Sequence, residues 1–252
     1  MKNVLITAGG TGIGKKIAEK FADKSYNVWV CDIDEASLKR VSKNWRTSLV
    51  DVSNEEKVKS LFEQIAKDWG RIDTVCCNAG IAGPTSPIEE VSLVNWQNCL
   101  AVNLEGAFLT TKYAIPLMKK KYDGSILFTS STAGVYGYPN RSPYSAAKWG
   151  VIGFMKTLAM ELGPFGIRSN AVCPGSVEGP RMDLVIAREA KLKGLSKEQV
   201  YKGYAESNSM RSFVQDEDIA NMMVFLASDD AKFVSGQVIS VDGHTENPDP
   251  KI

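Results

Sequence analysis

The chain has 252 residues, of which 44% are apolar and 23% charged, with 30 lysines and arginines against 29 aspartates and glutamates. This balance excludes a disordered chain, and the formal net charge of +1 argues against a nucleic-acid surface. No apolar stretch has the length of a membrane span, and Met1 and Lys2 lead straight into a strand, which leaves no room for a signal peptide. We therefore expect a cytoplasmic protein with neither a nucleic-acid nor a membrane partner.

The numbers of cysteines and histidines limit the disulfide and metal chemistry that the chain can carry. The chain has five cysteines without the spacing of a disulfide framework, and it has one histidine, His244. Cys99 falls in a predicted helix, and the other four fall in apolar strands: Cys31, Cys76, Cys77 and Cys173. We interpret them as small buried hydrophobic residues in a reducing compartment, and we predict no metal site.

Short apolar strands alternate with amphipathic helices along the first half. Strands are predicted over residues 4–6, 27–31, 49–50 and 74–77. The first is followed by a helix with Ile17, Ala18 and Phe21 on one face, and the third by a helix over 58–69. Ser53 and Glu56 before that second helix form a capping-box pattern.

The second half continues the alternation. Helices are predicted over residues 103–120, 142–162 and 219–227, and strands over 125–129, 168–172 and 238–241. Ser142 can cap its helix, with Pro143 in the first helical position. The segment 175–212 is too long for an ordinary connection, and we interpret it as a substrate loop. The order predicts an α/β fold: one domain over 1–252, a doubly wound (Rossmann) parallel seven-stranded sheet with helices on both faces.

The first strand runs into a glycine-rich loop, Gly9 to Gly14, which is typical of a dinucleotide-binding turn. Glycines let the backbone approach a pyrophosphate, and the helix N-terminus offers free N–H groups, although such a loop can also be a plain tight turn. Asp32 ends the second strand, 18 residues after Gly14. A carboxylate there can bind both ribose hydroxyls and repel a 2′-phosphate, or it can be an ordinary polar strand end. Loop and carboxylate together favour NAD over NADP.

Tyr144 and Lys148 lie one turn apart on a predicted helix. A nearby ammonium favours the phenolate, so this spacing suits proton transfer, although the same pair occurs on many solvated helix faces. Asn78-Ala79-Gly80 closes the fourth strand and Ser130-Ser131 the fifth. Ligands of doubly wound sheets bind at such strand ends. The alternative is that Asn78-Ala79-Gly80 is a plain turn and that the two serines only hydrogen-bond to the backbone.

Taken together, these residues resemble the short-chain dehydrogenase/reductase family over essentially the whole chain, as a 3-oxoacyl-carrier-protein-reductase-like, NAD-preferring member. The matching motifs are Thr7 to Gly14, Asp51-Val52, Asn78-Ala79-Gly80, Asn103, Ser131, Tyr144 with Lys148, Asn170 and Pro174-Gly175. Ser131 matches better than Ser130, because it lies 13 residues before Tyr144.

The resemblance implies roles for individual residues. The implied catalytic set is Asn103, Ser131, Tyr144 and Lys148. The implied cofactor-binding set is Gly9, Thr11, Gly12, Ile13, Gly14, Asp32, Asp51, Val52, Asn78, Ala79, Gly80, Tyr144, Lys148, Pro174, Gly175 and Val177. Two positions depart from the family pattern: Ala8 replaces a usual glycine, and Gly179 replaces a threonine that contacts the nicotinamide carboxamide. We expect Ser176 or backbone N–H groups to supply that contact.

We therefore predict an NAD-dependent oxidoreductase that interconverts a secondary alcohol and a ketone, on a small polar or anionic hydroxy compound or a polyol. Arginine suits a carboxylate, so the predicted substrate residues are Arg181 and Arg211 together with Ser131 and Tyr144. Arg141 and Arg188 lie nearby in the sequence, and any of these arginines could instead be solvated.

Two other functions fit the sequence. One is a 3-oxoacyl-carrier-protein reductase using NADPH, and the other is a nucleotide-sensing protein without catalysis. The resemblance also implies a homotetramer, with a dimer as the alternative. The Tyr144 helix carries four small residues, Ala146, Ala147, Gly150 and Gly153. They would either allow two subunits to approach closely or pack against the chain's own sheet. We expect a surface tail over residues 244–250.

Overall fold

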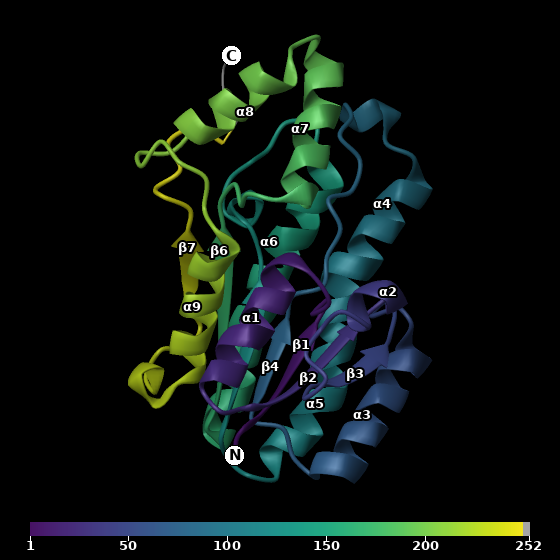
Figure 1. Ribbon diagram of the computed structural model, residues 1–252, viewed down its shortest axis with the longest axis vertical. Coiled ribbons are helices and arrows are strands. Elements are labelled where there is room, and N and C mark those ends of the chain that lie inside the picture. Colours follow the sequence, from purple (N-terminus) through teal and green to yellow (C-terminus); the bar gives the residue numbers. More distant parts are fainter. Residues whose placement is uncertain (249–252) are drawn as a thin grey trace.

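The computed structural model describes residues 1–248. Seven parallel strands form one sheet in the order β3-β2-β1-β4-β5-β6-β7 (Figure 1). The strands are β1 Asn3–Thr7, β2 Asn27–Asp32, β3 Arg46–Leu49, β4 Thr74–Cys77, β5 Gly124–Thr129, β6 Ile167–Pro174 and β7 Val238–Val241. The predicted doubly wound fold is confirmed, and the third strand lies three residues before its predicted start.

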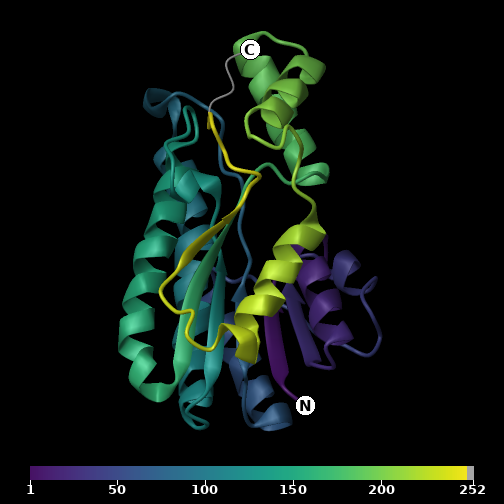
Figure 2. The same ribbon diagram turned by 90° about the vertical axis from the view of Figure 1, so that its left-hand side faces the viewer.

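Helices cover both faces of the sheet (Figure 2). They are α1 Gly12–Asp23, α2 Glu35–Leu38, α3 Glu55–Trp69, α4 Leu93–Leu100, α5 Gly106–Lys119, α6 Ser142–Leu162, α7 Pro180–Lys193, α8 Lys197–Glu206 and α9 Asp216–Ala227. One hydrophobic cluster joins α3, α5 and α6 to one face, and a second joins α1 and α9 to the other. Strands buried on both faces explain the continuous apolar runs in the sequence.

Alternation along β1 shows how the two layers are filled. Leu5 packs in the cluster with α3 and α5, whereas Val4 and Ile6 pack in the cluster with α1 and α9. Successive side chains of a strand point to opposite faces, so one strand contributes to both cores. The carboxyl ends of the central strands are thereby fixed together at one edge of the sheet, where the functional loops begin.

Two predicted helix caps are wrong. Ser53 donates its hydroxyl to Asp51 Oδ1 (2.7 Å), and α3 is capped one residue later, where Asn54 Oδ1 accepts from Lys57 N (3.1 Å). Ser142 is already inside α6, whose N-cap is Arg141, and the Ser142 hydroxyl is buried without a hydrogen-bond partner. Asn54 takes the extended backbone position before α3, whereas Arg141 has φ −128° and ψ 27° and makes no side-chain cap.

The segment 175–212 contains two helices, α7 and α8, which lie beyond the carboxyl ends of the strands (Figure 1). They share a small core of their own, formed by Val185, Ile186, Ala190, Val200, Tyr204 and Phe213. The predicted tail is anchored on this unit, because Asn208 and Thr245 form an antiparallel bridge. The rest of that tail, from residue 249 onward, lies outside the described residues.

The cysteines behave as expected. All five are buried and free, and burial raises the pKa of the Cys31 thiol to about 12. A thiol that stays protonated is a poor nucleophile and a poor metal ligand. Within residues 1–248, no group of three or more histidine, cysteine, aspartate or glutamate side chains could hold a metal ion. In the same part of the chain, no helix is long and apolar enough to span a membrane.

Candidate active site

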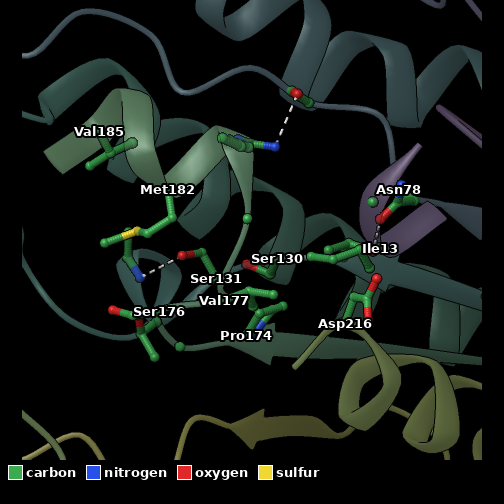
Figure 3. Close-up of a pocket in the computed structure, with 18 of the residues that line it drawn as sticks. Ile13, Asn78, Ser130, Ser131, Pro174, Ser176, Val177, Met182, Val185 and Asp216 are labelled. Atoms are coloured by element: carbon green, nitrogen blue, oxygen red, sulfur yellow. Dashed lines mark hydrogen bonds between the residues drawn. The ribbon is translucent and has the colours of Figure 1, made fainter. Parts of the chain in front are cut away.

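A cavity of about 520 Å³ opens at the carboxyl ends of β1, β4, β5 and β6. Its walls come from the glycine loop, from the ends of β4 and β5, from the start of α6 and from the segment after β6 (Figure 3). This is the edge at which doubly wound sheets bind their ligands. Of the predicted site residues, the lining includes Thr11 to Gly14, Asn78, Gly80, Ser131, Tyr144, Lys148, Pro174, Gly175, Val177 and Arg181.

The glycine loop is shaped to receive an anionic group. Gly12 has φ +50°, and a Cβ added there would meet no atom within 4 Å. A Cβ at Gly14 would instead overlap the Ala8 carbonyl oxygen, so α1 packs against the loop only because Gly14 lacks one. No side chain caps α1 and its first turn carries no acidic residue, which leaves free N–H groups and a positive helix end. The loop therefore fits a pyrophosphate.

Ala8, the first departure from the family pattern, has φ +50°. This left-handed conformation costs a residue with a Cβ about 1–2 kcal/mol, whereas glycine adopts it freely. The structure thus shows why glycine is usual at this position. The chain keeps the same turn with alanine and accepts the strain.

The Asp32 carboxylate is hydrogen-bonded to the glycine loop. Its Oδ2 accepts from Gly10 N (3.0 Å) and its Oδ1 accepts from Asp34 N (3.1 Å). A Cβ at Gly10 would collide with Ser37 Oγ and with the same carboxylate, so this close approach requires glycine. Asp32 lies beside the loop and outside the cavity lining, and Gly9, Asp51, Val52 and Ala79 are also outside the lining.

Asn78 braces the central strands beside the cavity. Its Oδ1 accepts from Thr129 Oγ1 (3.0 Å), and its Nδ2 donates to the Thr7 carbonyl (3.2 Å). The backbone N–H groups of Asn78 and Ala79 both donate to Thr7 Oγ1, at 3.0 and 2.9 Å. These bonds tie β1, β4 and β5 together where all three strands end.

Tyr144 and Lys148 both face the cavity from α6. Lys148 Nζ lies 5.6 Å from the centre of the Tyr144 ring and donates to the Thr129 carbonyl at 2.8 Å. Lys148 is only 3% exposed, so the pair is not a solvated helix face. Ser130 donates its hydroxyl to the Lys148 carbonyl (3.0 Å), whereas Ser131 Oγ accepts from Ala133 N (3.1 Å). The two serines therefore both line the cavity but have different hydrogen-bond partners.

The charges around Tyr144 favour the phenolate. Burial raises the pKa of the Tyr144 phenol, but the Lys148 ammonium, the Arg181 and Arg141 guanidiniums and the Ser131 hydroxyl together outweigh it, so the net pKa is lowered. Burial lowers the pKa of Lys148, and Arg181 lowers it further, while Tyr144 opposes the change. A phenol with a lowered pKa can act as a proton acceptor closer to neutral pH.

Asn103 approaches the same point from a π-helical turn, Ala101–Glu105, between α4 and α5. Its Nδ2 donates to the carbonyls of Cys99 (2.9 Å) and Ile81 (3.0 Å). Its Oδ1 is buried without a partner, and a Cβ added at Gly80 would lie 2.5 Å from that oxygen and 3.4 Å from Lys148 Nζ. An acceptor that is free and buried beside an ammonium suits a bound water.

The arginines divide into two groups. Arg181 lines the cavity and donates from Nη1 to the Gly80 carbonyl (3.2 Å). Arg211 lies outside the lining, because its guanidinium pairs with Glu246 at 3.0 Å, and Arg188 also lies outside it. Arg141, which was not among the predicted site residues, lines the cavity and donates to the Ala82 carbonyl (3.2 Å). Its position three residues before Tyr144, one turn away on the same face, is the signal that could have found it.

Gly179, the second departure, has φ +135° and immediately precedes α7. Threonine would be strained in this conformation, so the backbone seen here depends on glycine. Next to it, Glu178 accepts hydrogen bonds from Tyr201 of α8 (3.2 Å) and from Gln215 (3.0 Å). These bonds hold α8 against the segment that follows β6.

Comparison with known proteins agrees with this geometry. A family model described as enoyl-(acyl carrier protein) reductase matches residues 7–244. A 3-oxoacyl-[acyl-carrier-protein] reductase of Thermotoga maritima is 34% identical over 96% of both chains, and levodione reductase of Leifsonia aquatica is 32% identical over 95% of this chain and 92% of its own. The crystal structure of NAD⁺-bound xylitol dehydrogenase has a TM-score of 0.93 at 27% identity and covers 96% of this chain and 98% of that one.

A doubly wound sheet with this loop and with a tyrosine beside a buried lysine in the cavity defines an oxidoreductase that binds a nicotinamide dinucleotide. The chain belongs to the short-chain dehydrogenase/reductase family.

Proposed function

We propose that the protein is an NAD-dependent oxidoreductase that interconverts a secondary alcohol and a ketone on a small polar or anionic hydroxy compound or a polyol. The observation that carries this proposal is the place of Tyr144 in the cavity, where Ser131 also lines the wall and the buried Lys148 ammonium lies 5.6 Å from the ring centre and lowers the pKa of the phenol. Reduction of NAD⁺ by members of a panel of hydroxy acids, polyols and sugar-derived alcohols tests it. A protein that binds NAD but oxidises no alcohol would be the nucleotide sensor.

The chain's residues would hold the cofactor along the cavity. Thr11 to Gly14 would take the pyrophosphate and Asp32 the adenosine ribose. Asp51 and Val52 would bracket the adenine, and Asn78 to Gly80, Lys148, Pro174, Gly175 and Val177 would surround the nicotinamide half. Bound there, the nicotinamide supplies a hydride acceptor for the carbon that carries the hydroxyl.

Tyr144 as phenolate would remove the hydroxyl proton of the alcohol. Lys148 keeps the phenolate accessible by its charge and would also bind the nicotinamide ribose. Ser131 would donate a hydrogen bond to the substrate oxygen as it becomes a carbonyl oxygen. Asn103 is a positioning residue, since its free Oδ1 would hold a water that carries the proton from Lys148 toward solvent.

Cofactor preference gives a direct test at Asp32. In Asp32→Asn, the loss of the charge and of one acceptor should reduce the preference for NADH over NADPH by about 10- to 100-fold, the range expected when a charged hydrogen bond is lost. Dissociation constants for both dinucleotides, measured by fluorescence titration, provide the readout. Asp34→Asn is the matched control, because Asp34 caps α2 and makes no bond to the glycine loop. An unchanged ratio in Asp32→Asn would remove the basis for the NAD assignment.

The second candidate function is reduction of 3-oxoacyl-carrier-protein by NADPH, which the similarity to the Thermotoga maritima reductase favours. It requires a basic surface for the acidic carrier protein, and the net charge of +1 does not supply one overall. Steady-state assays with an acyl-carrier-protein thioester and with free hydroxy compounds distinguish the two functions.

We further propose a homotetramer assembled through α5 and α6. Phe108 on α5 and Trp149 and Met160 on α6 are 45, 52 and 82% exposed, which marks an apolar surface that a partner could cover. Ala147 is buried in the chain's own core and Gly150 faces Leu104, so these two small residues serve internal packing. Sedimentation velocity should give a tetramer for the native chain and smaller species for Trp149→Glu. A native monomer at micromolar concentration would contradict the assembly.

A further inference from the structure

The end of the cavity around Tyr144 carries an excess of positive charge. The guanidinium carbons of Arg141 and Arg181 lie 5.1 and 5.9 Å from the centre of the Tyr144 ring, and Lys148 adds a third cation. The acidic residues of the lining are elsewhere: Glu178 is bonded to Tyr201 and Gln215, and Asp216 lies across the cavity from Met182 and Val185 (Figure 3). The reacting end is thus a place where an anion is favoured.

Neither cavity arginine is neutralised by a carboxylate in the described part of the chain. Within residues 1–248, no carboxylate lies within ion-pair distance of Arg141 or Arg181, and each donates only to one backbone carbonyl. In addition, Arg141 Nε is buried and has no hydrogen-bond partner. A buried donor without an acceptor is costly, so this arrangement suits a ligand that brings acceptor oxygens.

Two buried carboxylates near the cavity are already hydrogen-bonded, and one of them, Asp242, accepts from the backbone N–H groups of His244 (3.0 Å) and Thr245 (3.2 Å). Glu189 accepts a hydrogen bond from Tyr204, which lines the cavity, and pairs with Lys193 at 2.8 Å. Glu189 itself is not part of the lining. The remaining wall at this end is formed by Tyr138, Met182, Val185 and Tyr204. An incoming anion therefore meets two guanidiniums and neutral side chains.

We infer that Arg141 and Arg181 bind the carboxylate of the substrate, and that the substrate is a short hydroxy acid, converted to the corresponding oxo acid. This inference rests on the proposed function. The planar guanidinium fork matches the two oxygens of a carboxylate, and the backbone bonds to Ala82 and Gly80 hold each fork in place. Because both forks lie within 6 Å of the ring centre of Tyr144, only a few bonds separate the carboxylate from the alcohol carbon.

Burial raises the pKa of Tyr144, Lys148 lowers it most strongly, and the two arginines help to lower it. This effect on Tyr144 must be separated from substrate binding. An effect on Tyr144 changes the turnover of every alcohol. A contact with a carboxylate changes only the turnover of acids. The decisive quantity is therefore the ratio of kcat/KM for a hydroxy acid to kcat/KM for its methyl ester.

The experiment compares 2- and 3-hydroxy acids of four or five carbons and 4-hydroxypentanoate, each with its hydroxyl on a secondary carbon, with their methyl esters, and NAD⁺ is the oxidant. For the best acid we expect the native ratio to be at least about tenfold in favour of the acid, and to fall by about 10- to 100-fold in Arg141→Met and in Arg181→Met, as for loss of a charged hydrogen bond. Arg46→Met is the control, because Arg46 pairs with Asp68 on the edge strand β3. That variant should keep the native ratio.

Several results would overturn the inference. Equal losses for acid and ester would mean that the arginines act on Tyr144 alone, and a weakened affinity for NADH at an unchanged ratio would assign them to the cofactor. Oxidation of uncharged alcohols in preference to acids would refute the hydroxy acid while leaving the proposed function intact. Calorimetry of the oxo acids and their esters with the enzyme–NADH complex adds a readout without turnover. Binding of acids alone supports the inference even if oxidation fails, and equal or no binding refutes it.

Discussion

Replacing Tyr144 by phenylalanine is expected to lower kcat by about 10²–10⁴-fold, the usual contribution of a positioned acid–base group. The change removes one oxygen and keeps the ring beside Arg141 and Arg181. Since the glycine loop and Asp32 are untouched, NADH affinity should stay within a few-fold of the native value. Initial rates with the best alcohol and a fluorescence titration with NADH measure both quantities.

The matched control is Tyr26→Phe. Tyr26 lies directly before β2, at the amino edge of the sheet, where its ring packs edge-on against Phe21. Its phenol is remote from the cavity lining, so the variant should retain native kcat. If Tyr144→Phe retained most of its activity, the proton acceptor would have to be another group and the mechanism would be wrong.

Replacing Lys148 by methionine should lower the rate of alcohol oxidation at neutral pH by about 10²-fold, at the lower end of acid–base contributions. Methionine fills a similar buried volume but removes the cation 5.6 Å from the Tyr144 ring and the donor to the Thr129 carbonyl. Without that ammonium the pKa of Tyr144 rises, because burial then outweighs the remaining cations more easily.

The pH dependence gives the sign of this effect. Alcohol oxidation needs the phenolate, so its rate rises with pH as Tyr144 loses its proton, and that rise should move to higher pH in Lys148→Met. Ketone reduction needs the neutral phenol, so its rate should persist to higher pH in the variant. Lys156→Met is the control, because Lys156 lies on the same helix, is exposed and donates to the Gly236 carbonyl. Identical pH profiles for the Lys148 variant and the native enzyme would contradict the electrostatic role.

Much of the fold could be predicted, because a buried parallel strand has a simple pattern. Residues 74–77 and 125–129 are apolar runs ended by turn residues, and they form β4 and β5 almost as expected. Boundaries were less predictable. The capping patterns at Ser53 and Ser142 each missed by one residue, since several neighbouring polar residues can cap a helix and packing decides between them.

Site residues were predictable from the sequence where the chemistry requires one residue type. They were less predictable where the three-dimensional position of a side chain decides whether it reaches the cavity. Spacing suggested Tyr144 with Lys148 and the family resemblance implied Ser131, and the structure places all three in the lining of one cavity. The choice between Arg141, Arg181 and Arg211 could not be made, because it depends on how α7 and α8 fold over the cavity and on the pairing of Arg211 with Glu246. The left-handed backbone conformation of Ala8 could not be predicted from the sequence either, since alanine rarely adopts it.

The positive charge that Arg141, Lys148 and Arg181 concentrate near Tyr144 bears on the internal equilibrium of the enzyme. Three cations disfavour a cationic pyridinium nearby and tolerate the neutral dihydropyridine, so the protein should hold the reduced dinucleotide more tightly than the oxidised one. An anion in the same compartment reverses part of that bias. Substrate and oxidised cofactor would then reinforce each other's binding, and the charge of the ligand would set the direction in which the bound species prefer to react.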